Sequence, residues 1–223
     1  MQQKEHYIDI HTHRSGLSEA AIRNLFPEDG EKISDSGYFS VGLHPWYIDR
    51  ENHPYQMEKV KKLADHHRVL AIGESGPDKL AEAPMDLQIR IFNDHIKIAG
   101  DKNKPLIIHA VKTYNEVVAV KKETGSAVPW IIHGFAGKKE LADMLLQHGM
   151  FLSFGKALLN PEANANKIIG EMPMDRIFLE TDDSDETIDI IYKKAAEVLN
   201  MEISELCRQM KNNFKRVFLR NDE

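Results

Sequence analysis

Short, continuous runs of apolar residues recur along the chain, and longer amphipathic stretches separate them. Each run is rich in Ile, Val, Leu or Phe and is bounded by Gly, Pro or a polar residue, which predicts a buried β-strand. Their continuous hydrophobicity is typical of parallel strands that are covered on both faces. The seven clearest runs are residues 7–10, 38–43, 69–73, 106–108, 128–132, 150–154 and 176–179.

The stretches between these runs carry apolar residues at helical spacing, as in the stripe formed by Leu87, Ile91, His95 and Ile98. Alternating strands and helices predict right-handed βαβ units and a parallel sheet or barrel. No shift in composition marks a linker, so we expect a single domain over residues 1–223. The other expected helices lie at 55–65, 114–121 and 138–147, with two or three more within 184–218.

The expected fold class is therefore α/β, as a TIM-type (β/α) barrel that is distorted because the region of its second strand is shortened. Seven clear runs are one fewer than an eight-stranded barrel needs. The gap lies between His13 and Gly42, where a full helix–strand–helix does not fit. Residues 21–25 can supply a short second strand without its helices, and a seven-stranded or open barrel is the alternative.

Composition excludes several classes of function. The net charge of −6 argues against a domain that holds nucleic acid through a bulk positive field, although it leaves room for an enzyme whose metal ions supply positive charge locally. The longest apolar runs are far shorter than the ~18 residues of a membrane-spanning helix. The only cysteine is Cys207, and no apolar signal core follows Met1. We expect a cytoplasmic protein with no membrane contact, no disulfides and no obligate protein partner.

Side chains that can bind metal close five of the expected strands. Parallel strands of a barrel end at one mouth, so we expect these side chains to meet there. His11 and His13 lie two residues apart and therefore face the same side of their strand. Imidazoles combined with carboxylates suit Zn²⁺, Mn²⁺ or Mg²⁺. The candidate ligands are His11, His13, Glu74, His109, His133 and Asp182.

Four histidines and two carboxylates are more than one tetrahedral ion needs. We therefore expect two divalent metal ions per chain, with Glu74 as the carboxylate that bridges them. Two ions ~3.5–4 Å apart can bind both the attacking and the leaving oxygen of a phosphoester. Single members of the set also have plainer explanations: a lone His109 or His133 can be a packed core residue, and Asp182 can cap the next helix.

Six segments together resemble the motifs of the TatD-related metal-dependent hydrolases, a family often described as deoxyribonucleases. The resemblance covers residues 7 to 183, with the motifs in the family's order. It implies a distorted TIM barrel of the amidohydrolase-like superfamily and metal-dependent hydrolysis, typically of DNA phosphodiester bonds. The segments are His-Thr-His at 11–13 after Asp9, Val-Gly-Leu-His-Pro at 41–45, Ala-Ile-Gly-Glu-Ser-Gly-Pro-Asp at 71–78, Pro-Leu-Ile-Ile-His at 105–109, Ile-His-Gly-Phe-Ala-Gly at 132–137 and Leu-Glu-Thr-Asp at 179–182.

The resemblance also implies roles for individual residues. Asp182 matches the general base that takes a proton from a metal-activated water, and with Glu74 it forms the expected catalytic pair. His44 matches a histidine beside the site that can touch a substrate phosphate, and Asp78 matches a residue that orients a ligand or its loop from behind. The first ion falls to His11, His13, Glu74 and Asp182, and the second to Glu74, His109 and His133.

Several residues depart from the family's pattern. Where the family usually has His-Ser-Arg, this chain has His109, Ala110 and Val111; Lys112 follows and can supply charge to a substrate without the bidentate geometry of arginine. Ser15 stands where an acidic residue is usual. The acidic residues of 183–186 replace the usual Ala-Pro and either add negative charge at the mouth or cap the next helix. These changes leave the metal chemistry intact and bear on the substrate.

The function we expect from the sequence is metal-dependent hydrolysis of DNA or a small phosphoester by a TatD-like nuclease. The alternative keeps the same centre but cleaves an amide, ester or lactone of a small molecule. A metal-binding scaffold with little catalysis is a third hypothesis, and the complete ligand set argues against it. Trp46 and Tyr47, beside His44, can stack on a base or pack their loop, and lysine pairs such as Lys102 and Lys104 form solvated faces or steer a polyanion.

Overall fold

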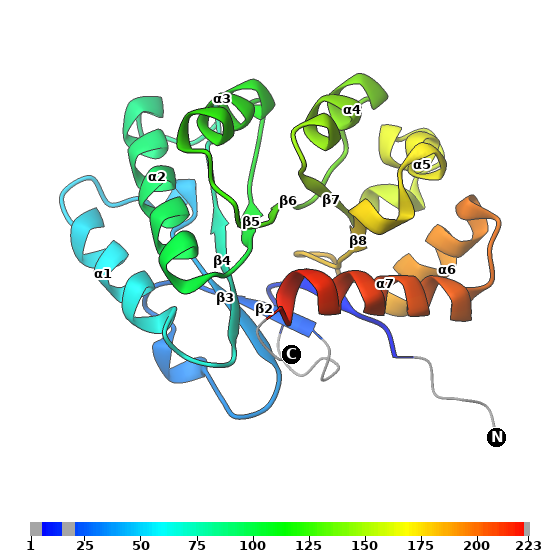
Figure 1. Ribbon diagram of the computed structural model, residues 1–223, viewed down its shortest axis with the longest axis horizontal. Coiled ribbons are helices and arrows are strands. Elements are labelled where there is room, and N and C mark those ends of the chain that lie inside the picture. The colour runs from blue at the N-terminus through cyan, green and yellow to red at the C-terminus, as the bar shows by residue number, and fades with distance from the viewer. Residues whose placement is uncertain (1–5, 15–20, 221–223) are drawn as a thin grey trace.

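The structure is a computed structural model that describes residues 6–14 and 21–220. Ser15 lies outside the described residues. Eight strands form one sheet in which every neighbouring pair is parallel and the order follows the sequence from β1 to β8 (Figure 1). The strands are β1 (Asp9–Thr12), β2 (Ala21–Leu25), β3 (Tyr38–Val41), β4 (Val69–Ser75), β5 (Leu106–Ile108), β6 (Trp130–Ile132), β7 (Phe151–Phe154) and β8 (Ile177–Leu179).

The two edges of the sheet come together, so the sheet forms a nearly closed barrel. Beyond the end of β8, Asp182 pairs with Thr12 of β1 in a parallel bridge. The amide of Asp182 donates to the carbonyl of His11 at 2.9 Å, and the amide of His13 donates to the carbonyl of Asp182 at 3.1 Å. The expected barrel is thus confirmed, with eight strands rather than seven.

The helices that the structure describes cover the outside of this barrel (Figure 1). The apolar stripe predicted for α2 (Met85–Lys102) is confirmed, because Leu87, Ile91, His95 and Ile98 are all buried. Between β2 and β3 the structure has only the short 3₁₀ turn η1 (Gly30–Lys32), which confirms that the region of the second strand is shortened. The α-helices are α1 (His53–Leu63), α2 (Met85–Lys102), α3 (Tyr114–Thr124), α4 (Lys139–Gln147), α5 (Asn164–Ile168), α6 (Ile188–Leu199) and α7 (Ile203–Phe218). No helix in the described ranges is long and apolar enough to cross a bilayer.

Apolar side chains fill the barrel interior, and α7 closes its lower end. Phe214, Val217 and Phe218 of α7 belong to the same buried cluster as the inward-facing residues of the strands. Because all eight strands are parallel, their carboxyl ends, which carry the polar residues, meet at the opposite mouth. The strand residues of the cluster include Ile8, Ile10, Ile22, Ala71, Ile107, Ile131, Phe151 and Phe178.

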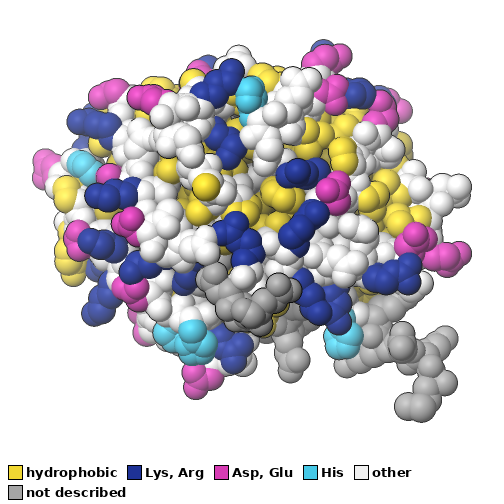
Figure 2. Space-filling model, in the orientation of Figure 1, with side chains coloured by type: hydrophobic (Ala, Val, Ile, Leu, Met, Phe, Trp, Pro, Cys, Tyr) yellow, Lys and Arg dark blue, Asp and Glu magenta, His cyan; other side chains and the backbone are white. Residues whose placement is uncertain are grey.

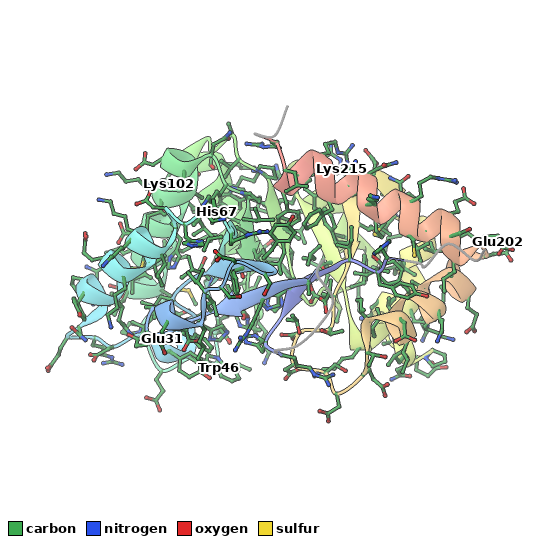
Figure 3. All side chains as sticks on the ribbon, turned by 90° about the horizontal axis from the view of Figure 1, so that it is seen from below. Glu31, Trp46, His67, Lys102, Glu202 and Lys215 are labelled. Carbon is green, nitrogen blue, oxygen red and sulfur yellow. The ribbon has the colours of Figure 1, made fainter. Side chains whose placement is uncertain are left out.

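Basic side chains gather over the face that carries α7, in the view of Figure 2. Arg176 and Arg216 lie over the ring of Phe151, with their guanidinium carbons 5.0 and 5.9 Å from its centroid. Long basic side chains often cover apolar surface in this way while their charges stay in water. Figure 3 shows Lys102 on this side as well, away from Trp46. Lys102 pairs with Asp65.

Candidate metal centre

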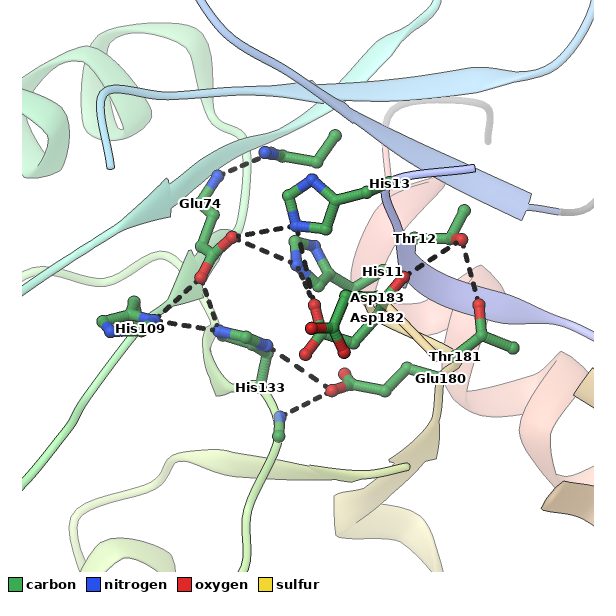
Figure 4. Close-up of polar contacts among 12 residues, drawn as sticks. His11, Thr12, His13, Glu74, His109, His133, Glu180, Thr181, Asp182 and Asp183 are labelled. Atoms are coloured by element: carbon green, nitrogen blue, oxygen red, sulfur yellow. Dashed lines mark hydrogen bonds and ion pairs between the residues drawn. The ribbon is translucent and has the colours of Figure 1, made fainter. Parts of the chain in front are cut away.

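All six candidate ligands lie together at the mouth opposite α7, and they come from the ends of five strands (Figure 4). His11 and His13 stand at the end of β1, and Glu74 is the penultimate residue of β4. His109 and His133 directly follow β5 and β6. Asp182 follows β8 and completes the ring. The ligand atoms form three overlapping groups, each within 4.8 Å: His11, Glu74 and His133; His11, His13 and Asp182; and His44, Glu74 and His109.

Glu74 is the centre of this arrangement, because its two carboxylate oxygens face different histidines. Its Oε2 lies 3.3 Å from Nε2 of His11 and 3.3 Å from Nε2 of His13. Its Oε1 lies 2.8 Å from Nδ1 of His109 and 2.8 Å from Nε2 of His133. The carboxylate can therefore serve one cation on each side, which is the geometry of a bridging ligand.

The backbone around Glu74 has little room to vary. A side chain on Gly73, whose φ is +135°, would place its Cβ 2.2 Å from the carbonyl oxygen of Ile107. A Cβ on Gly42 would lie 2.5 Å from the carbonyl oxygen of Glu74. Only glycine lets the neighbouring strands approach so closely. The amide of Glu74 donates to Oδ1 of Asn24 on β2 at 2.7 Å, so three strands hold this residue.

Contacts between the first and last strands hold Asp182. The hydroxyl of Thr181 donates to Oδ2 of Asp9 at 2.6 Å, and the amide of Thr181 donates to Oδ1 of the same carboxylate at 3.1 Å. Asp182 itself has φ +54°, in the left-handed region that Asp tolerates better than most residues. This backbone leaves Oδ1 of Asp182 3.6 Å from Nε2 of His11 and 3.5 Å from Nε2 of His13.

Asp78 contacts His109 on the side of the ring opposite Glu74. Oδ2 of the buried Asp78 accepts from Nε2 of His109 at 2.9 Å and from the indole Nε1 of Trp46 at 2.7 Å. Burial alone would raise the pKa of Asp78, but hydrogen bonds from the Leu80 amide, His109 and Trp46 hold it below its usual value. The ionised carboxylate fixes the His109 proton on Nε2 and leaves the lone pair of Nδ1 facing Glu74.

His44, which the sequence predicted as a substrate contact, lies among the candidate ligands. Its Nε2 is 3.3 Å from both Oε1 of Glu74 and Nδ1 of His109. Its other nitrogen, Nδ1, accepts a hydrogen bond from the Trp46 amide at 3.2 Å. Burial lowers the pKa of His44, which favours the neutral ring. A neutral ring that accepts at Nδ1 carries its proton on Nε2, so it acts as a donor at this position.

Glu180 is a residue of the site that the sequence analysis left without a role. It is fully buried, and its Oε1 accepts from the Gly134 amide at 2.6 Å and lies 3.5 Å from Nδ1 of His133. This contact orients the ring of His133 so that Nε2 faces Glu74, as carboxylates commonly do for metal-bound histidines. The signal was available in the sequence, since an acid directly after a buried strand needs a partner.

The donor set fits a cation better than it fits a set of internal hydrogen bonds. His11 is fully buried, yet neither of its ring nitrogens makes a hydrogen bond to any described residue. Nδ1 of His109 and Oε1 of Glu74, which both offer lone pairs in the tautomer set by Asp78, face each other at 2.8 Å. The Nε2–H of His44 lies 3.3 Å from both atoms and is a single donor for two acceptors. Lone pairs that face each other repel, and a divalent cation between them would remove the repulsion.

The charges within the cluster are strongly coupled. Burial by itself raises the pKa of Glu74, but His133, His109, His11 and His13 outweigh it and hold that pKa well below its usual value. Glu74 is therefore ionised at neutral pH and available as a ligand.

Two further groups at the centre have raised pKa values. Burial acts to lower the pKa of His133, but the carboxylates of Glu74 and Glu180 raise it well above its usual value. Burial raises the pKa of Asp182, whose side chain is 28% exposed at the mouth. A carboxylate with a raised pKa is a better proton acceptor than an ordinary surface aspartate.

The residues that depart from the family's pattern lie around the mouth. Lys112 is exposed, and none of the described residues pairs with its side chain. Asp183 pairs with Lys156, and one guanidinium nitrogen of Arg14 donates to the backbone carbonyls of residues 184–186. The acids of 183–186 do not cap the next helix, because α6 begins at Ile188 with Thr187 as its N-cap.

Comparison with known proteins assigns the family. A family model described as TatD related DNase matches residues 27–219. The chain belongs to this family. Candidate ligands come from five strand ends of this TatD-family barrel. The matched segment begins after His11 and His13, so it contains four of these strand ends and omits that of β1.

Two bacterial proteins illustrate the relatives of this TatD-family chain. The uncharacterized metal-dependent hydrolase YabD of Bacillus subtilis is 30% identical over 198 residues, which cover 81% of this chain and 77% of YabD. The uncharacterized metal-dependent hydrolase YcfH of Escherichia coli is 30% identical over 151 residues, which cover 66% of this chain and 56% of YcfH. The chain thus spans little more than half the length of YcfH.

Solved structures show the same fold. The crystal structure of the E. coli TatD homologue YjjV superposes with a TM-score of 0.79 at 20% sequence identity, covering 89% of this chain and 86% of that one. A TatD-family hydrolase from Entamoeba histolytica gives a TM-score of 0.77 at 14% identity, covering 95% of this chain and 97% of that one.

Proposed function

We propose that this protein is a metal-dependent hydrolase that cleaves phosphodiester bonds of DNA at a centre for two divalent cations. One observation carries the proposal: the two oxygens of Glu74 face separate groups of histidines. The description of the family model supports DNA as the substrate, and the curated relatives carry the name of metal-dependent hydrolases. Zn²⁺, Mn²⁺ and Mg²⁺ are the candidate cations.

The residues divide into two groups that hold the cations. His11, His13 and Asp182 with Oε2 of Glu74 would hold one, and His109 and His133 with Oε1 of Glu74 would hold the other. Bound cations supply Lewis-acid charge for the phosphoryl oxygens and acidify a nearby water.

The remaining chemistry belongs to side chains of the chain itself. Asp182, open to the mouth, takes the proton of the attacking water, and its raised pKa suits that task near neutral pH. The Nε2–H of His44 donates to a phosphoryl oxygen and so helps to fix the substrate. Asp78 and Glu180 keep His109 and His133 in the orientation that ligation needs.

A second candidate function keeps the same centre but acts on an amide, ester or lactone of a small molecule. Val111 favours it, because this position lacks the arginine that can bind a phosphate in two places. Lys112, exposed and unpaired among the described residues, offers only a single charge in its place.

Cleavage of a 3′-labelled single-stranded oligonucleotide tests the proposal. Metal-stripped protein receives Mg²⁺, Mn²⁺ or Zn²⁺, and His133→Ala and Asp182→Ala proteins are assayed in parallel. His67→Ala is the matched control, because Figure 3 shows His67 on the far side of the molecule from Trp46. We expect cation-dependent cleavage by the unchanged protein and by His67→Ala, and loss of cleavage in the other two. Stoichiometric cation binding without any cleavage would overturn the phosphodiesterase proposal and favour the second candidate.

A further inference from the structure

An exposed aromatic pair lies directly beside the metal centre. Trp46 and Tyr47, in the 3₁₀ turn η2 (Pro45–Tyr47) that follows His44, are 60% and 56% exposed. We call this pair the aromatic shelf. The chain has one other tryptophan, Trp130, and that residue is fully buried. A large aromatic surface held in water beside a reaction centre is a feature of binding sites rather than of packing.

The indole of Trp46 is held in a fixed orientation. Its Nε1–H donates to Oδ2 of Asp78 at 2.7 Å, and its backbone amide donates to Nδ1 of His44 at 3.2 Å. The ring meets the imidazole of His44 edge-on, with centroids 5.4 Å apart and planes at 88°. A side chain tied at both ends loses little entropy when a ligand covers it, so its exposed surface is available for binding.

One carboxylate connects the shelf to the candidate metal ligands. Oδ2 of Asp78 accepts from both Trp46 and Nε2 of His109. His109 in turn faces the shared carboxylate of Glu74. The indole therefore keeps a constant position relative to the place where a scissile phosphate would bind. Tyr47 extends the shelf outward and is braced by Phe26, with ring centroids 5.0 Å apart.

We propose that the aromatic shelf is the subsite for the nucleobase next to the scissile phosphodiester, on which that base stacks. This inference rests on the proposed phosphodiesterase function and assigns a substrate form to it. Stacking on an aromatic side chain needs a base whose flat face is free, so the occupant is a single-stranded nucleotide rather than a base inside a duplex. Every base has such a face, so the shelf binds without sequence preference. Stacking also supplies substrate affinity in a chain that has Val111 where the family usually has a phosphate-binding arginine.

Tryptophan fluorescence reports on the shelf directly, because the other tryptophan is buried. The experiment uses Asp182→Asn protein with bound Mn²⁺, which is expected to bind but not cleave, and a single-stranded oligothymidylate as the probe. We expect saturable quenching of the emission, and no quenching in Trp46→Phe protein carrying the same Asp182→Asn change. A series of oligonucleotides, each with one abasic residue at a different position, locates the stacked base. We expect most of the quenching to be lost for only one of these positions.

Kinetics separate stacking from an indirect effect through Asp78. Trp46→Ala is compared with Trp46→Phe, which keeps an aromatic face but lacks the indole N–H. Stacking predicts a loss of roughly 10- to 100-fold in kcat/KM for Trp46→Ala on a normal oligonucleotide, a smaller loss for Trp46→Phe, and little loss on the abasic substrate. Tyr55→Ala is the control, since Tyr55 is equally exposed but lies on α1.

The outcomes distinguish this inference from the proposed function. Equal losses on normal and abasic substrates, together with weaker Mn²⁺ binding, would show that Trp46 acts only by positioning Asp78 and would overturn the shelf. Cleavage without quenching and with unchanged kinetics in Trp46→Ala would also overturn it while leaving the nuclease proposal standing. Quenching without cleavage by the unchanged protein would show that a base stacks on the shelf, but it would reject phosphodiester hydrolysis and with it the place of the shelf next to a scissile bond. Neither quenching nor cleavage would reject both.

Discussion

Acid should weaken this fold through one histidine that lies far from solvent. His95 on α2 is fully buried, its Nε2 accepts from the Leu43 amide at 2.9 Å, and its Nδ1–H donates to the Ile91 carbonyl at 2.8 Å. The contact with the Leu43 amide requires the neutral ring, because a protonated Nε2 cannot accept. Burial lowers the pKa of His95 from 6.5 to about 4, against the smaller opposing effect of the Ile91 carbonyl.

The sign and the size of the effect follow from this depression. The unfolded chain binds a proton on His95 below pH 6.5, whereas the folded chain resists it down to about pH 4. The stabilisation is complete above the unfolded pKa and is lost as the pH falls through this window. Its full value is about 3 kcal/mol, of which about 2 kcal/mol is lost between pH 7.5 and pH 5.

Asp9 acts in the opposite direction, so the pH dependence of the unchanged protein does not isolate His95. Burial raises the pKa of Asp9 to about 7, which makes its contribution to folding larger in acid. His95→Gln provides the comparison, because glutamine can still accept from the Leu43 amide but does not titrate. Urea unfolding of both proteins in EDTA, at pH 7.5 and pH 5, gives the two free-energy differences.

We expect the stability advantage of the unchanged protein over His95→Gln to shrink by about 2 kcal/mol between the two pH values. If the difference in free energy of unfolding between the two proteins is the same at pH 7.5 and pH 5, the reasoning is refuted, because the pKa of His95 would then be the same in the folded and unfolded chain.

Three other measurements test the site and its frame. Glu180→Gln should weaken cation binding by about 10- to 100-fold with little change in fold, because His133 loses its orienting charge; calorimetric titration checks this, and unchanged affinity would contradict the role given to Glu180. Gly73→Ala should lower the free energy of unfolding by about 3 kcal/mol, since the new Cβ would overlap the Ile107 carbonyl. Gly100→Ala, on the open face of α2, should raise it by up to about 1 kcal/mol in the same denaturation assay. Cation present at 100 times its dissociation constant should raise the free energy of unfolding by about 2.7 kcal/mol relative to protein in EDTA, and a melting temperature that ignores the cation would argue against a native site.

The barrel and the six candidate ligands were accessible to sequence reasoning because both follow local rules. Buried parallel strands are continuous apolar runs, and their carboxyl ends converge wherever the strands form a barrel. The strand β2 was harder to predict, since Ala21–Leu25 includes the polar residues Arg23 and Asn24 and only the short turn η1 separates it from β3. Its polar Asn24 proves useful, because it holds the amide of Glu74 from 50 positions away.

Hydrogen bonds between residues far apart in the sequence account for most of the features of the site and core that the sequence did not predict. Glu180 reaches Gly134 across 46 positions, and His95 reaches Leu43 across 52. Periodicity placed His95 on a buried helix face but could not indicate its partner. No spacing rule connects such pairs, because the closure of the barrel brings them together.

The shared carboxylate of Glu74 has a thermodynamic consequence. In the proposed centre, two cations that share opposite oxygens of one side chain would not bind as independent ligands. The first cation would fix the rotamer of Glu74, which raises the affinity for the second cation. It would also neutralise part of the carboxylate charge, which lowers that affinity. Whatever factor results, linkage requires it to be the same in both directions, whichever cation binds first. Because the two proposed sites also differ in their ligands, the coupling is measured as the change in the dissociation constant of one site when the other is filled, and that change gives the free energy that passes through a single carboxylate.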